Sequence, residues 1–378
     1  MSGPLGSLRI IHVFRSPVGG LFRHVMDVVR GQIARGHQLG IICDSLTGGE
    51  HAATLLRKLS PDLALGLTRL PMPRQIGLSD LLITRHVANR VVREGPDVVH
   101  GHGAKGAAYA RLAVSNSGPC RVYTPHGGSL LYRPGTAVSS FYLTLEKILR
   151  SRTDLFLFES AFIERLYRAK VGDPGAISRI VPNGVSDEEF APVPLKPDAT
   201  DLLYVGELRH LKGVDLLIDA LAALRSKGKT LSATIVGDGR SRQELIERTK
   251  ALALDDVVRF LPPTPAREAF ALGRTMIVPS RAESFPYIVL EAAAAAKPLV
   301  VTNVGGIADM FGPYADRLIA PNDHDAIERA LMKSINETES TAANARLLQQ
   351  RIKANFSLTN MVDDGIAAYR VAIAARKG

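Results

Sequence analysis

Short runs of apolar and β-branched residues alternate along the chain with longer amphipathic stretches. In the first half, runs with strand character lie at 8–14, 38–43, 97–100, 121–124, 154–158 and 177–181. The stretches between them have the apolar spacing of helices near 20–36, 79–94, 104–116, 138–151 and 159–170. Strands that alternate with helices in this way are typical of a parallel sheet with helices on both faces.

The second half repeats this alternation. Its predicted strands lie at 201–205, 232–237, 257–261, 276–279, 299–302 and 317–319. Its predicted helices lie near 213–227, 240–252, 265–273, 286–296, 323–337 and 340–354. A last helical stretch over 358–375 has no strand after it, and we expect it to pack back toward the first half.

A proline-rich segment separates the halves. Residues 191–197 hold three prolines in seven positions, which disfavours helix and removes donors from any strand ladder. We therefore predict an α/β protein of two Rossmann-like parallel-sheet domains that face a cleft, a favoured place for a small-molecule site. The predicted boundaries are an N-terminal domain over 1–190, a linker over 191–200, a C-terminal domain over 201–357 and a final helix over 358–378.

The composition agrees with this fold and excludes several classes of protein. Of the 378 residues, 46% are hydrophobic and 22% charged, which excludes wholesale disorder. No apolar run approaches the ~18 residues that a membrane span requires. The two cysteines, Cys43 and Cys120, exclude a disulfide framework and a four-cysteine zinc site. A reducing cytoplasm is the expected setting.

The formal net charge of +10 is unevenly distributed. Residues 1–190 hold 23 Lys and Arg against 15 Asp and Glu, a net +8, whereas the remaining residues hold 24 against 22, a net +2. A basic first half favours an acidic partner, such as a phosphorylated substrate or an anionic membrane surface. Nucleic acid is not expected, because the cations are scattered and aromatic residues make up only 6% with no Trp.

Three glycine-rich turns follow predicted strands of the first half. The turn at 17–20 places Gly19 and Gly20 before a helix, where backbone N–H groups can approach an anion. The turn at 100–103 holds His100 and His102, whose spacing on a strand suits a metal, although no third ligand of matching spacing is evident. The turn at 124–128 places His126 beside two glycines. Such strand ends line ligand crevices in α/β sheets.

The second half carries the chemistry of an anion site. A short loop after the strand at 201–205 holds Arg209 and Lys212 just before a helix, a favourable place for a diphosphate. Glu283 and Glu291 lie eight residues apart around a strand-to-helix turn. If the span were helical they would be ~12 Å apart along its axis. Retaining glycosidases need carboxyl groups ~5 Å apart, so we expect the two to hold different parts of one elongated ligand.

Together these motifs resemble those of the retaining nucleotide-sugar glycosyltransferases of family 4, which have the GT-B fold. The resemblance covers nearly the whole chain. It is carried by Gly19-Gly20, Thr124–Gly128, Val181–Val185, Gly206–Gly213, Gly237–Gly239, Glu283–Glu291 as the E-x7-E element, and Gly305–Asp309. It implies that the first domain binds the acceptor and the second binds the nucleotide sugar.

The resemblance also implies roles for individual residues. Glu283 would lie by the donor sugar, Glu291 would bind the ribose, and Lys212 would hold the diphosphate. The implied catalytic residues are Glu283, His126, Lys212 and Arg209. The implied donor-binding residues are Gly19, Gly20, Gly206, Arg259, Phe260, Leu261, Phe285, Pro286, Tyr287, Ile288 and Glu291. We expect His100, His102, Lys105 and Arg133 on the acceptor side.

One of two departures from the family pattern concerns the diphosphate site, and the other, Asp309 in place of the more usual Glu, is a smaller change. Glu207 stands where the family usually has an arginine before the Lys-Gly pair, and Arg209 is expected to replace it. The family implies transfer with retention, with no cofactor and no metal. No motif fixes the donor, and we expect a UDP-sugar first and GDP-mannose next. A lipid-linked or cell-surface polysaccharide acceptor would place the protein at the inner face of the cytoplasmic membrane. The cations expected to face it are Arg74, Lys105, Arg111, Arg133, Lys147, Arg150 and Arg152.

Two other functions use the same fold. A nucleotide-sugar epimerase would share the diphosphate site but would have no acceptor. A non-catalytic sugar- or nucleotide-binding subunit is motivated by Glu207 at the arginine position.

Overall fold

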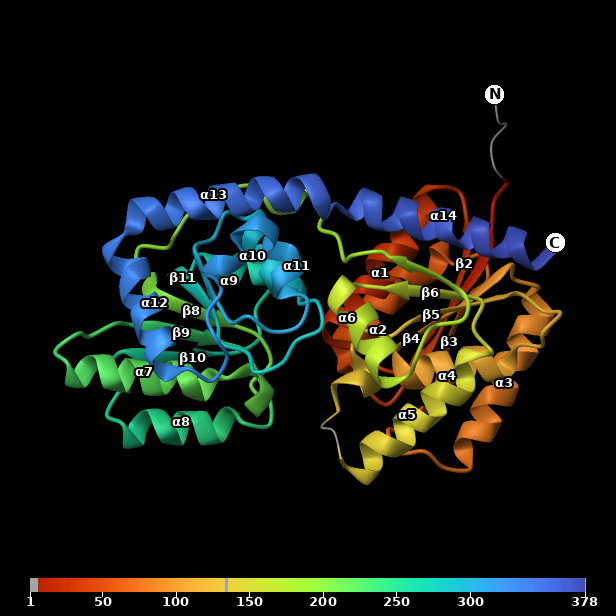
Figure 1. The fold of residues 1–378 in the computed structure, drawn as a ribbon, viewed down its shortest axis with the longest axis horizontal. Coiled ribbons are helices and arrows are strands. Elements are labelled where there is room, and N and C mark those ends of the chain that lie inside the picture. The colour runs from red at the N-terminus through yellow and green to blue at the C-terminus, as the bar shows by residue number, and fades with distance from the viewer. Residues whose placement is uncertain (1–5, 133–134, 378) are drawn as a thin grey trace. The chain divides into compact units, whose positions relative to one another are not determined.

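The computed structural model of the chain describes residues 6–132 and 135–377 (Figure 1). The chain divides into two units, one made of residues 1–183 with 358–378 and the other of residues 184–357. Each unit contains one parallel sheet, as the alternating pattern predicts. The candidate residue Arg133 lies outside the described residues.

The first unit is built on a seven-stranded sheet in the order β3-β2-β1-β4-β5-β6-β7, in which all neighbouring strands are parallel. Its strands are β1 Arg9–Phe14, β2 Gln38–Asp44, β3 Leu67–Leu70, β4 Val98–His102, β5 Cys120–Thr124, β6 Leu155–Phe158 and β7 Ile177–Ile180. Its helices are α1 Gly19–Ala34, α2 Gly49–Leu59, α3 Ser79–Glu94, α4 Gly103–Ala113, α5 Ala137–Arg150, α6 Ala161–Lys170 and α14 Leu358–Lys377.

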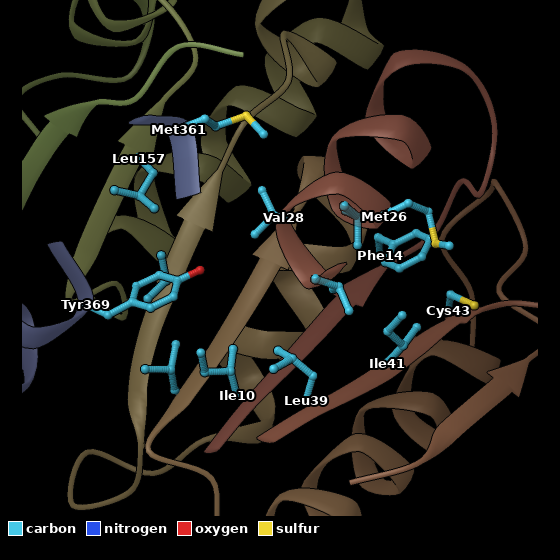
Figure 2. Packing of buried hydrophobic residues seen from close by; sticks show 14 of the residues in the cluster. Ile10, Phe14, Met26, Val28, Leu39, Ile41, Cys43, Leu157, Met361 and Tyr369 are labelled. Carbon is cyan, nitrogen blue, oxygen red and sulfur yellow. The ribbon is translucent and has the colours of Figure 1, made fainter. Parts of the chain in front are cut away.

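Apolar side chains from α1 and α14 bury one face of this sheet. Figure 2 shows Val28 of α1 and Met361 and Tyr369 of α14 over the strands, in the same cluster as Ile10. The other face is covered by α3, whose Ile83, Val87 and Val91 recur at helical spacing and are buried. Burying one aliphatic side chain of this size contributes about 1.5–3 kcal/mol, so the two faces fix the register of the sheet.

The second unit is built on a five-stranded parallel sheet in the order β10-β9-β8-β11-β12. Its strands are β8 Thr200–Val205, β9 Ala233–Val236, β10 Val258–Leu261, β11 Gly273–Val278 and β12 Leu299–Val301. Its helices are α7 Val214–Ser226, α8 Arg242–Ala251, α9 Ala266–Phe270, α10 Tyr287–Ala294, α11 Ile307–Phe311, α12 His324–Asn336 and α13 Thr338–Asn355. Two apolar clusters, one on each face of this sheet, form the core of the unit.

The proline-rich segment is not a linker. The units divide after Asn183, so this segment belongs to the second unit. Prolines offer no N–H group, but Lys196 donates its N–H to the carbonyl of Ala271, and Arg267 donates to the carbonyls of Glu189 and Ala191. These bonds fix the segment on its own unit, and the last helix, α14, returns to the first.

The sequence prediction differs from the structure at three elements. It lacks α2 and β3, and β3 is a four-residue edge strand whose side chains are all only partly buried. The strand predicted at 317–319 is reduced to one isolated bridge between Thr302 and Ile319, because a 3₁₀ turn occupies Gly312–Arg317. Within residues 6–132 and 135–377, every helix is too short or too polar to cross a bilayer.

Candidate active site

Glycines allow the loops of the second unit to touch at the carboxyl edge of its sheet. A Cβ on Gly237 would lie 1.9 Å from the carbonyl oxygen of Gly206, and a Cβ on Gly213 would lie 2.0 Å from that of Pro279. Gly213 also has a φ of +68°, which L side chains rarely adopt. The loops that follow β8, β9 and β11 therefore form one surface that side chains at these positions would force apart.

An ion pair holds the loops after β8 and β11 in register. Arg281 donates to both carboxylate oxygens of Asp215, at 2.7 and 2.6 Å, and its backbone N–H donates to the carbonyl of Leu211. A bidentate arginine–carboxylate pair fixes orientation as well as distance. This arrangement brings Lys212 and Glu283 together, although they are 71 positions apart in the sequence.

Lys212 and Glu283 form the charged centre of this edge. The Nζ of Lys212 lies 2.7 Å from Oε1 and 2.9 Å from Oε2 of Glu283. The hydroxyl of Ser280, which is fully buried, donates to Oε1 at 2.7 Å. The Glu283 side chain is 8% exposed and that of Lys212 is 18% exposed. A carboxylate this buried requires a partner, and Lys212 supplies the compensating charge.

The start of α10 lies four residues after Glu283. Pro286 is the N-cap of this helix, no side chain caps it, and no acidic residue lies in its first turn. Such an end carries partial positive charge that suits an anion. Phe285 and Tyr287 are buried, Ile288 is partly buried, and Glu291 lies in the second turn with little exposure.

The remaining donor candidates in the second unit are engaged within the protein. Arg209, which we expect to replace the family arginine, pairs with Glu207 at 3.0 Å. Glu207 occupies the position of that arginine, and its carboxylate compensates the charge of Arg209. On β10, the guanidinium of Arg259 donates to Asp198 and Thr234. The carbonyl of Leu261 accepts from the N–H of Gly237, and Phe260 packs against the core.

In the first unit, Gly19 and Gly20 open α1 directly after β1. Val18 is the N-cap and provides no side-chain cap, and Gly19 has a φ of +59°. A surface pocket of about 430 Å³ lies beside this turn. Its lining includes Gly19, Arg23, Asp27, Arg30 and His51.

Five histidines gather on the face of the first sheet that α1 and α14 cover. In the strand register His12 lies opposite His100, and Phe14 lies opposite His102. His24 comes from α1, and His126 follows β5. Sequence reasoning identified His100, His102 and His126 but missed His12 and His24. The available signal was the position of His12, two residues before the end of the first predicted strand.

These rings are neutral because they are buried. Desolvation lowers the pKa of His12 and of His24 from 6.5 to about 4. Hydrogen bonds from Gln32 and Asn183 respectively oppose part of that shift. The pKa values of His100, His102 and His126 fall well below 6.5, first through burial and then through neighbouring histidines. The cluster therefore offers hydrogen bonds without charge.

The ring nitrogens of this cluster lie close enough together to suggest a metal site. The ligand atoms of His12, His100 and His102 lie within 4.8 Å of one another, as do those of His24, His102 and His126. However, His12 Nδ1 is 2.9 Å from His102 Nε2, and His102 Nδ1 is 3.1 Å from His126 Nε2. Two ligands of a tetrahedral zinc would be about 3.4 Å apart. The observed spacings are those of hydrogen bonds between the rings.

The loop that carries His126 is strained, and its backbone contacts a buried carboxylate from another loop. His126 has a φ of +54°, which is uncommon for a residue other than glycine. Burial raises the pKa of Glu159 to about 7, although backbone N–H groups of Glu159, His126 and Gly127 oppose the shift. Glu159, directly after β6, was not identified from the sequence.

The acceptor-side candidates are less available than expected. His100 is buried, and both its ring nitrogens are occupied, by Tyr369 and Thr124. Lys105 lies 2.9 Å from Asp80 and donates to the carbonyl of Gln75. Both residues therefore support the first unit from within, because their polar groups already have partners. His126, which is only half-buried, remains open to a ligand.

Two family models match consecutive parts of the chain. The model described as Glycosyltransferase Family 4 matches residues 18–189, and the model described as Glycosyl transferases group 1 matches residues 185–349. The boundary between the two matches lies close to the division between the structural units.

Known proteins of this kind are similar to 64% of the chain or more. A glycogen synthase of Mycobacterium tuberculosis is 25% identical over 385 residues, covering 96% of this chain and 92% of its own. A D-inositol 3-phosphate glycosyltransferase of Actinosynnema mirum is 29% identical over 272 residues, covering 64% of each chain. Anabaena HepE, solved with UDP and glucose, superposes with a TM-score of 0.79 at 18% identity, covering 95% of this chain and 98% of its own. Fold and family matches agree, and the chain belongs to the family 4 glycosyltransferases of GT-B fold.

Proposed function

We propose that this chain transfers a hexosyl group from a UDP-sugar to a hydroxyl of a saccharide acceptor, with retention of configuration. The observation that carries the proposal is the contact of Lys212 with Glu283 just before the uncapped start of α10. A cation and a helix N-terminus favour a diphosphate, while a carboxylate accepts hydrogen bonds from sugar hydroxyls. UDP is favoured over GDP because the similar HepE was solved with UDP and glucose.

The positive charges of the second unit would stabilise the diphosphate that departs when the donor bond breaks. Cleavage of the bond between the sugar C1 and the phosphate oxygen leaves negative charge on the diphosphate and positive character on the ring. Lys212 and the start of α10 are preorganised to stabilise the diphosphate. The acceptor hydroxyl attacks from the same face, its oxygen bonds to C1, and its proton passes to the departing phosphate oxygen. This route requires no enzyme nucleophile, metal or cofactor.

The neutral histidine has a different role. His126 is half-buried, and burial holds its pKa well below 6.5, so it meets the sugar as an uncharged ring. A neutral ring contacts hydroxyls without competing with Lys212 for the diphosphate. We therefore assign it to the orientation of the sugar near the reacting carbon.

The pocket beside Gly19 is the proposed place for an anionic part of the acceptor. It is about 430 Å³ in volume, within the range of small-molecule sites. Arg30 and His51 on its lining are exposed, whereas Arg23 pairs with Asp27. An acceptor with a phosphate or carboxylate would match this surface and the net +8 charge of residues 1–190.

We propose that the protein associates with the surface of an anionic membrane. Leu78 at the start of α3 is 85% exposed and Phe141 of α5 is 54% exposed, and both helices pack on α4. Arg74 and Lys147 are exposed near these positions in the sequence. Apolar side chains beside cations suit a lipid interface. Arg111, expected on this surface, is instead fully buried against Glu146 and Tyr123.

Flotation with anionic liposomes tests the membrane proposal. We expect binding at low salt, and we expect Phe141→Ser to weaken it several-fold, since this substitution removes exposed apolar area. Leu347→Ser on α13 is the control, because Leu347 is 39% exposed but lies in the second unit. Equal flotation of both variants, or no binding of the unmodified protein, would contradict the proposal.

The family membership disfavours the two other functions, and each predicts a different product. An epimerase would convert a nucleotide sugar into an isomer in the absence of any acceptor. A binding subunit would hold the nucleotide sugar and never release the nucleotide. Product analysis with and without saccharide acceptors separates the three functions.

Thermal-shift measurements with UDP- and GDP-sugars test the donor directly. A ligand that binds the folded state raises the melting temperature by mass action, by an amount that grows with concentration. We expect the largest shift with a UDP-sugar. If no nucleotide sugar shifts the transition, the proposed function is wrong.

A further inference from the structure

A chain of hydrogen bonds crosses the buried face of the first sheet and ends at His126. It begins at Gln32 of α1, whose Oε1 lies 2.9 Å from Nε2 of His12. Nδ1 of His12 lies 2.9 Å from Nε2 of His102, and Nδ1 of His102 lies 3.1 Å from Nε2 of His126. Gln32, His12 and His102 are buried, so water does not compete for these bonds.

The position of the proton on each ring can be assigned in turn, from Gln32 to His126. A neutral imidazole has one N–H donor and one bare acceptor nitrogen. An amide oxygen only accepts, so His12 carries its proton on Nε2 and its Nδ1 is bare. His102 must then donate from Nε2, which leaves its own Nδ1 bare. His126 in turn donates from Nε2.

A second branch leaves the other end of the same amide. Gln32 Nε2 donates to the hydroxyl of Tyr369 at 3.4 Å, and that hydroxyl lies 2.7 Å from Nδ1 of His100. Nε2 of His100 lies 2.8 Å from Oγ1 of Thr124. If the amide were turned over, both branches would reverse and every ring would carry its proton on Nδ1. The orientation of one side chain therefore sets the protons of His12, His102 and His126. It favours Nε2–H on His100 as well, because the Tyr369 hydroxyl then has its own proton to donate to Nδ1 of that ring.

We propose that Gln32 is a positioning residue that holds His126, through His12 and His102, as the Nε2–H tautomer, with Nδ1 as a bare acceptor for a ligand hydroxyl. Within residues 6–132 and 135–377, Nδ1 of His126 has no hydrogen-bond partner. Burial keeps the intervening rings neutral, which the ordering requires. That the hydroxyl belongs to a sugar rests on the proposed function, whereas the tautomer does not.

Nitrogen NMR of ¹⁵N-histidine protein tests the tautomer, with assignments from single-histidine substitutions. Protonated and bare ring nitrogens have well-separated shifts. We expect His12, His100, His102 and His126 as Nε2–H tautomers. His24 is an internal reference of the opposite kind, because its Nδ1 faces Oδ1 of Asn183 at 2.9 Å.

Substitutions at Gln32 and at Tyr369 separate the branches. Gln32→Met has a similar length and removes both polar atoms, so we expect His126 to become a mixture of tautomers. Tyr369→Phe is the matched control: it removes only a hydroxyl, cuts the branch to His100 and leaves His126 as Nε2–H. Gln32→Glu retains an oxygen acceptor and should restore the His126 tautomer.

Several results would overturn the proposal. A proton on Nδ1 of His126 in the unmodified protein would do so alone, even if Gln32→Met fails to fold. An unchanged His126 in a folded Gln32→Met protein would do so as well. So would one equivalent of metal in elemental analysis, because ligating nitrogens cannot carry these protons.

Kinetics connect the tautomer to transfer. We expect Gln32→Met to lower kcat about tenfold with little change in the KM of the donor, and Gln32→Glu to recover part of the loss. If the unmodified protein transfers no sugar while the NMR result holds, the proposed function fails and the tautomer assignment stands. Equal kcat for Gln32→Met and the unmodified protein, with a mixed tautomer, would remove His126 from the reaction.

Discussion

The two parallel sheets end in opposite kinds of chemistry. At the first, burial keeps a group of histidines neutral, and the rings bond to one another. At the second, Lys212 and Glu283 form an ion pair with little exposure. The two groups suit different ligand chemistry, since a diphosphate needs cations whereas sugar hydroxyls need donors and acceptors without charge.

The histidine cluster and the Lys212–Glu283 pair are also held in place in different ways. The histidines are fixed by strand register and by side chains from α1 and α14, so they depend on the packing of a whole face. The charged pair is fixed by loops that touch through glycines and through Arg281. We therefore expect changes at the first edge to act first on stability and changes at the second to act first on transfer.

The largest effect is expected from Lys212→Ala. Removing the cation eliminates the main charge that stabilises the departing diphosphate, so kcat should fall about 10²–10³-fold in a transfer assay. Lys229→Ala is the control, because Lys229 is an exposed lysine of the same unit. A Lys212→Ala protein within threefold of the control would contradict the role of the second edge.

The next largest effect is the loss of stability in acid, which the buried histidines of the first unit cause. His12 and His24 have pKa values of about 4 when folded against 6.5 when unfolded, so the unfolded chain binds more protons between these values. Stability is therefore full above pH 6.5 and is lost as the pH falls toward 4, with a slope of about 1.4 kcal/mol per pH unit for each such ring. Denaturant unfolding from pH 7 to pH 4.5 measures the slope, and a flat profile would show that the rings are not buried as described.

Glu159 should act in the opposite direction. Its pKa is about 7 when folded against 4.5 when unfolded, so the folded state retains a proton that the unfolded state has released. Its contribution to stability therefore declines as the pH rises from 4.5 to 7 and stays low above that. We expect Glu159→Gln to be more stable than the unmodified protein at pH 8 and to lose this advantage at pH 5. An equal difference at both pH values would contradict this assignment.

The smallest effect is expected from Arg209→Ala. Arg209 is 40% exposed and already paired with Glu207, and exposed ion pairs contribute little. We expect a change in kcat of at most about threefold. A loss as large as that of Lys212→Ala would show instead that Arg209 leaves Glu207 to bind the donor.

Much of the fold was predictable because each buried strand is an apolar run. Apolar side chains predominate in β1, β8 and β9, so hydropathy alone locates these strands. Hydropathy missed β3, which is an edge strand with no fully buried residue. It placed the linker at the prolines because the pattern does not show that Lys196 and Arg267 fix that segment to its own unit.

The site was less predictable because it depends on contacts between distant residues. Glycine turns located the loops, and the motif located Lys212 and Glu283 separately. Their contact across 71 positions and the buried hydroxyl of Ser280 required coordinates. His12 and Gln32 look like ordinary core positions. Only the register of β1 against β4 shows that His12 lies opposite His100, and only the coordinates show that Gln32 contacts His12.

The path of the chain has a practical consequence. Since the polypeptide enters the second unit after Asn183 and leaves it after Ser357, that unit is an insertion between α14 and the rest of the first. A fragment that stops at position 183 would lack the phenol of Tyr369 and expose the apolar face that α14 covers. Expressing the first sheet by itself therefore calls for a splice that joins position 183 to 358, whereas the second unit is one uninterrupted stretch of sequence.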